Sequence, residues 1–67
     1  MNANFQSYTD AETYVANTCG FELSDEEFTA VANAAWTAHD FDLTDEQNKE
    51  NVDAAIIVAL EELGWKF

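Results

Sequence analysis

Apolar residues recur at intervals of three and four positions in three separate stretches of the chain. Because a helix turns about 100° per residue, this spacing places the apolar side chains of each stretch on one face. The three stripes are Ala11, Tyr14, Val15 and Cys19; Phe28, Val31, Ala32 and Ala35; and Val52, Ala55, Ile56, Ala59, Leu60 and Leu63. They predict three amphipathic helices, over residues 10–19, 25–38 and 45–63.

The start of each predicted helix carries the same short motif. In a capping box, a Ser or Thr side chain accepts a hydrogen bond from the backbone N–H three residues later, where a Glu or Gln side chain accepts one in return. The chain has this motif at residues 9–12, 24–27 and 44–47. Gly20 and Gly64 directly follow the first and third helices, and glycine readily adopts the left-handed conformation that closes many helices.

The connections between the predicted helices, 20–24 and 39–44, are short, which favours antiparallel packing of consecutive helices. No segment alternates for long between apolar and polar residues, so a sheet is not expected. The sequence predicts an all-α protein, a small three-helix bundle, in which residues 1–67 form a single helical domain. The aromatic residues outside the helices are expected to close the ends of the bundle: Phe5, Tyr8, Trp65 and Phe67.

The composition is strongly acidic. With 14 Asp or Glu against 2 Lys and no Arg, the formal net charge is −12. Direct binding to nucleic-acid phosphates or to an anionic membrane surface requires a basic patch, so both are excluded as partners. The apolar content of 48% is nevertheless too high for a disordered chain, so we expect it to fold.

The sequence shows no sign of export or membrane insertion. No basic and apolar leader typical of a signal peptide is visible, and the longest mostly apolar run, 54–60, is too short to cross a bilayer. Cys19 is the single cysteine, so no disulfide forms within the chain and a reducing compartment is favoured. We therefore expect a cytoplasmic protein.

Few side chains are suited to catalysis or metal binding. A zinc site lacks ligands, because the chain has one cysteine and one histidine. The histidine, His39, is expected to cap the second helix or to close the end of its apolar stripe. Residues 40–51 begin like a calcium loop, but Asp45 stands where glycine is needed and Asn51 where the bidentate Glu is needed. We expect no enzymatic activity, no catalytic residue, no metal and no cofactor.

About half of the acidic residues are explained by helix starts, where the positive end of the helix dipole favours an anion. Glu61 and Glu62 are not, because they fall in the last turn of the third helix, where negative charge is unfavourable. Since repulsion within a highly charged chain opposes compactness, the surplus of acid suggests a role beyond folding.

The third helix aligns several of these acids on its outer face. At 100° per residue, one line is formed by Glu46, Glu50, Asp53 and Glu61. Ile57 falls in the middle of this line and has two interpretations. It is either an anchor that faces a partner, or it is covered by Phe5, Tyr8 or the C-terminal tail.

The remaining acids are expected to gather at the two ends of an up-down-up bundle. Charge concentrated in this way steers association with a basic partner. One end would carry Asp10, Glu12, Asp40, Asp42, Asp45 and Glu46, and the other Glu22, Asp25, Glu26, Glu27, Glu61 and Glu62. The candidate partner-binding residues are Asp25, Glu26, Glu27, Asp40, Asp42, Asp45, Glu46, Glu50, Asp53, Ile57, Glu61 and Glu62.

In size, charge and scarcity of basic residues, the chain resembles the small acidic DNA-mimic inhibitors encoded by phages, including anti-CRISPR proteins. The resemblance lies in character and involves no sequence motif. It implies a stoichiometric inhibitor, acting in the host cell cytoplasm, that binds and blocks a positively charged nucleic-acid-binding surface of another protein. The implied partner is a basic nucleic-acid-binding host protein or complex, such as a CRISPR complex or a restriction enzyme.

Two other interpretations remain open. One is a small helical protein-interaction or regulatory module, similar to an antitoxin, that recognises its partner through Ile57, Val58 and the aromatic ends. The other is a structural domain from a halophile, in which the acids are an adaptation to salt. Small residues on the second helix would permit self-packing, so the expected state is a monomer or a weak homodimer.

Overall fold

The computed structural model describes residues 5–18 and 22–65, which contain three helices and no strand. The helices are α1 (Tyr8–Thr18), α2 (Asp25–Ala38) and α3 (Asp45–Glu62). The prediction of a small all-α three-helix bundle is confirmed. The bounds of α2 match the sequence prediction, whereas α1 begins two residues early; its expected last residue, Cys19, lies outside the described residues.

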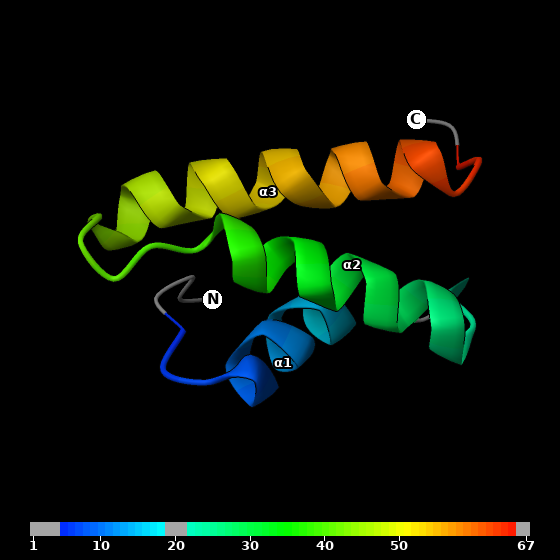
Figure 1. The fold of residues 1–67 in the computed structure, drawn as a ribbon, viewed down its shortest axis with the longest axis horizontal. Helices are drawn as coiled ribbons and strands as arrows, with labels where there is room; N and C mark the ends of the chain where they lie inside the picture. The colour runs from blue at the N-terminus through cyan, green and yellow to red at the C-terminus, as the bar shows by residue number, and fades with distance from the viewer. Residues whose placement is uncertain (1–4, 19–21, 66–67) are drawn as a thin grey trace.

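The central helix of the bundle is α2. It packs against α1 on one side and against α3 on the other, and α2 and α3 lie side by side in opposite directions (Figure 1). The segment before α1 returns to the end of α2, where the Phe5 backbone N–H donates a 3.0 Å hydrogen bond to His39 Nε2. The starts of α1 and α3 therefore share one end of the molecule with the end of α2.

The core follows the predicted stripes closely. Its buried residues are Phe5, Ala11, Tyr14, Val15, Val31, Ala32, Ala35, Val52, Ile56 and Leu60. Leu63 is an exception, because α3 ends at Glu62 and the Leu63 side chain stays 39% exposed at the helix C-cap. Trp65 packs against the core in its place, after Gly64 turns the chain with a φ of 93°.

Two of the three predicted capping boxes are formed. Ser24 and Glu27 exchange bonds at the start of α2, with N···O distances of 3.1 and 3.3 Å. Thr44 and Gln47 do the same at the start of α3, with distances of 3.1 and 3.2 Å.

The box predicted at residues 9–12 is wrong. Asp10 Oδ2 accepts a 2.8 Å bond from the Gln6 backbone N–H, and α1 starts at Tyr8, so Thr9 lies inside the helix. The Asp10 carboxylate, in the first turn of α1, thus bonds back to the segment before the helix, which is the kind of bond that the motif assigned to Glu12.

A buried asparagine fixes the connection between α2 and α3. Asn48, in the first turns of α3, is fully buried. Its Oδ1 accepts a 3.0 Å bond from the Asp40 backbone N–H, and its Nδ2 donates a 2.9 Å bond to the Asp40 carbonyl oxygen. Both backbone polar groups of Asp40 are therefore bonded to the Asn48 side chain of α3. These two bonds hold the loop and its acidic residues in a defined place.

None of the described helices is both long enough and apolar enough to span a membrane.

Candidate functional site on the outer face of the third helix

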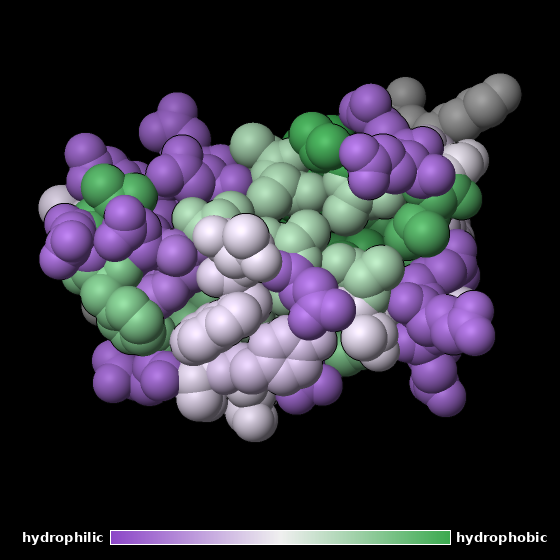
Figure 2. Space-filling model, viewed as in Figure 1, coloured by the Kyte–Doolittle hydropathy of each residue, from purple (hydrophilic) through white to green (hydrophobic). Residues whose placement is uncertain are grey.

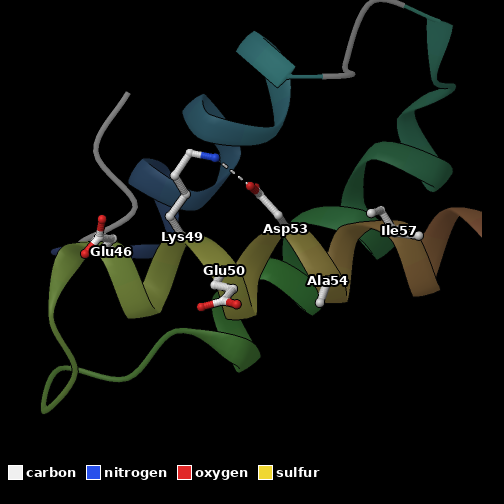
Figure 3. A pocket seen from close by; sticks show the side chains of 6 residues that line it. All are labelled: Glu46, Lys49, Glu50, Asp53, Ala54 and Ile57. Carbon is white, nitrogen blue, oxygen red and sulfur yellow. Dashed lines mark hydrogen bonds and ion pairs between the residues drawn. The ribbon is translucent and has the colours of Figure 1, made fainter.

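The acidic line predicted along α3 forms the floor of a shallow hollow. The hollow is lined by Glu46, Lys49, Glu50, Asp53, Ala54 and Ile57 (Figure 3). All six come from α3, and their spacing of three and four residues is what places them on one face. Glu61 lies one turn beyond Ile57 on the same face but does not line the hollow.

Lys49 and Asp53 form an ion pair across the hollow. Lys49 Nζ lies 2.7 Å from Asp53 Oδ2, one helical turn away. Sequence analysis did not single out Lys49, although a Lys and an Asp four residues apart on a helix are a recognisable pair. The pair cancels one negative charge of the line, so Glu46 and Glu50 carry the net negative charge of the hollow.

Asp53 is also tied to the fold. Its Oδ1 accepts a 2.5 Å hydrogen bond from the Tyr14 hydroxyl of α1, and its side chain is 35% exposed. Burial alone would favour the neutral carboxyl, but the bonds from Lys49 and Tyr14 outweigh it and lower the pKa of Asp53. The Asp53 carboxylate is therefore partly a structural group, whereas sequence analysis treated it only as a partner-binding one.

The same contacts act on the two donors. Burial, together with the bond to Asp53 and its negative charge, raises the pKa of Tyr14 well above its ordinary value. The bond to Asp53 and its charge also raise the pKa of Lys49. Around neutral pH, Tyr14 stays a hydrogen-bond donor and the ion pair stays charged.

Ile57 is exposed on this surface. Its side chain is 45% exposed, and that of the adjacent Val58 is 55% exposed. Neither aromatic residue proposed as a cover lies over it: Phe5 is buried against Tyr14, with ring centroids 5.6 Å apart, and Tyr8 packs edge-on against Trp36. The third suggested cover was the C-terminal tail. Its Trp65 packs against the core and bonds to Glu27, and residues 66–67 lie outside the described residues.

The loop before α3 presents a second group of candidates. Asp40 Oδ1 accepts a 2.9 Å bond from the Asp42 backbone N–H, so the Asp40 carboxylate stabilises the turn. Both aspartates are exposed, and between them Phe41 is 65% exposed. The next two candidates, Asp45 and Glu46, continue this end of the molecule into the first turn of α3.

The far end of the bundle carries the remaining candidates. Trp65 Nε1 donates a 3.1 Å bond to Glu27 Oε2, which joins the end of α3 to the start of α2. The bond from the Ser24 backbone, and then that from Trp65, lower the pKa of Glu27. The candidate acids at this end are Asp25, Glu26, Glu27, Glu61 and Glu62, of which Glu27 is engaged in the fold.

His39 occupies the position expected at the end of α2. It is the C-cap residue, its backbone N–H bonds to the Ala35 carbonyl, and its ring stacks on Trp36 at 5.9 Å. Its Nε2 accepts the bond from the Phe5 backbone N–H. Among the described residues, no group of three or more His, Cys, Asp or Glu side chains could hold a metal ion.

Comparison with known proteins adds no relative to this picture. No protein-family model matches the chain, and neither a curated protein nor a solved structure matches it.

Proposed function

We propose that this protein binds a positively charged nucleic-acid-binding surface of another protein and blocks it, acting as a stoichiometric inhibitor. The observation that carries the proposal is the outer face of α3, where Glu46, Glu50 and Glu61 are exposed. The one lysine among the described residues, Lys49, is already paired with Asp53. This face therefore offers several carboxylates to a basic partner with little internal neutralisation.

The negative charge must be concentrated on one face to imitate nucleic acid, because the average charge density of the whole surface is lower than that of DNA. An accessible surface of 4362 Å² and a net charge of −12 average one charge per ~360 Å², against roughly one per 100 Å² for duplex DNA. The α3 face places Glu46, Glu50 and Glu61 along one side of a single helix. From Glu46 to Glu61 it extends over about 22 Å at 1.5 Å per residue, which is comparable to the width of a DNA groove with its flanking phosphates.

Affinity capture from a nuclease-treated host lysate, followed by competition with DNA, tests this function. The expected result is recovery of a nucleic-acid-binding protein whose complex weakens with salt and is displaced by DNA. Glu50→Lys should reduce affinity by roughly 10-fold or more, because it places like charge against the partner. Glu22→Lys, an exposed acid outside the α3 face, changes the net charge equally and serves as the matched control.

Two outcomes contradict the proposal. One is that no nucleic-acid-binding protein is recovered. The other is that the recovered protein binds DNA and this chain at the same time.

A further inference from the structure

α3 has two apolar faces, and only one of them is used by the fold. Val52, Ile56 and Leu60 are buried against the rest of the bundle. A second group, the exposed patch, consists of Ala54, Ile57 and Val58, spaced at i, i+3 and i+4. A helix that only had to cover α2 would carry polar residues there, so the exposed patch has no role in the observed packing.

Carboxylates bracket the exposed patch along the helix. Glu50 lies one turn before Ala54, and Glu61 lies one turn after Ile57. Figure 2 shows apolar surface over the middle of α3 with hydrophilic surface towards both of its ends, and Figure 3 shows Glu50 beside Ala54. An apolar centre with a charged surround is the usual anatomy of a protein–protein interface.

We infer that the exposed patch and its carboxylates bind a basic amphipathic helix of a partner protein. An apolar side chain of that helix packs between Ile57 and Val58, while its Lys or Arg residues contact Glu50 and Glu61. The i, i+3, i+4 spacing is that of one helix packed along another. That the partner is positively charged follows from the proposed function, on which this inference rests. The inference adds that the partner's binding element is a helix.

The charge of this face opposes the other possible occupants. A second copy of the chain would bring another net charge of −12 against the same carboxylates, and nucleic acid would be repelled as well. A basic amphipathic helix is complementary both to the carboxylates and to the exposed patch. The carboxylates are expected to speed association, and Ile57 is expected to slow dissociation, because apolar contacts at the centre of an interface mainly set its lifetime.

Two synthetic helical peptides test the inference directly. Both carry the same number of lysines; one has leucines at i, i+3 and i+7 on one face, and the other has alanines there. Titration of the wild-type chain should give at least roughly 10-fold tighter binding of the leucine peptide, since tenfold corresponds to about 1.4 kcal/mol and burial of a single leucine side chain is enough to supply it. NMR shift changes should centre on Ile57 and Val58.

Two variants locate the effect. Ile57→Ala should remove most of the preference for the leucine peptide, whereas Leu63→Ala, which truncates a comparably exposed residue outside the patch, should retain it. Far-UV circular dichroism establishes that both variants are folded. Three results would each overturn the inference. The first is equal affinity for the two peptides, and the second is NMR shift changes located away from the patch. The third is a wild-type dimer in sedimentation that Ile57→Ala abolishes.

The test also separates the inference from the function on which it rests. If the leucine peptide binds the patch but the lysate yields no nucleic-acid-binding protein, the proposed function fails and the helix-binding surface stands. If a DNA-binding protein is captured in a DNA-competitive complex that Ile57→Ala leaves unchanged, the function stands and the inference fails.

Discussion

The hydroxyl of Tyr14 donates a 2.5 Å hydrogen bond to the carboxylate of Asp53, so that the two outer helices of the bundle, α1 and α3, are joined directly. Asp53 at the same time holds Lys49 on the surface. One carboxylate thus belongs both to the interior of the fold and to the acidic face. A charge reversal at Asp53 would disturb stability as well as binding, which is why Glu50 is the better position for testing the function.

Removing the Tyr14 hydroxyl should destabilise the protein. Tyr14→Phe breaks a bond to a charged acceptor, and such bonds contribute about 1.5–3 kcal/mol to the free energy of unfolding. Tyr8→Phe is the matched control, because Tyr8 contacts Trp36 through its ring and should lose only a few tenths of a kcal/mol. Urea unfolding of the two variants checks this, and equal losses would show that the Tyr14 bond contributes nothing.

The same bond makes stability depend on alkaline pH. The pKa of Tyr14 is raised in the folded state, by burial first and by Asp53 second, above the value of about 10 expected when unfolded. A raised pKa means that the stabilisation is complete below about pH 10 and is lost as the pH rises towards the folded value. In Tyr8→Phe, which retains Tyr14 as its only tyrosine, tyrosinate absorbance should therefore appear well above pH 10, together with loss of helical circular dichroism. Ionisation near pH 10 with the helices intact would contradict the structure.

Local chemistry explains what the sequence predicted correctly. The starts of α2 and α3 depend on Ser24 with Glu27 and on Thr44 with Gln47, pairs only three residues apart. The start of α1 was mispredicted because the helix begins at Tyr8, before Thr9, and the Asp10 carboxylate bonds back to the Gln6 N–H. The motif at residues 9–12 does not reveal this earlier start.

What the sequence could not provide depends on contacts between distant segments. The Tyr14 to Asp53 bond joins residues 39 positions apart, and no periodicity predicts it. The spacing of Glu46, Glu50 and Asp53 on one face was predictable, because helical geometry fixes it. Whether Ile57 is exposed was not predictable, because it depends on where the chain segment containing Phe5 packs.

Asn48 was missed for the same reason, and its importance can be tested. Asn48→Ala would remove both bonds to the Asp40 backbone. The Asp40 C=O would keep its 3.2 Å bond from the Leu43 N–H, but the Asp40 N–H would lose its acceptor, and we expect a cost of about 1–3 kcal/mol. Asn51→Ala, on an exposed position of the same helix, should change the free energy of unfolding by no more than about 0.5 kcal/mol. Denaturant unfolding measures both. A tolerated Asn48→Ala would mean that water replaces the side chain and that the loop does not depend on it.

Low ionic strength separates a charge directed at a partner from a charge adapted to salt. At about 0.01 M salt the screening length is roughly 30 Å, close to the 31 Å length of the molecule, so that repulsion acts across the whole chain. The core, the two capping boxes and the Tyr14 bond are all independent of salt bridges between distant surfaces, and we expect the helical circular dichroism to persist at 0.01 M. A halophilic domain would instead unfold there and regain its helices in molar salt. That result would remove the reason to assign the acids of α3 to a basic partner, because the same acids would then be explained by the solvent.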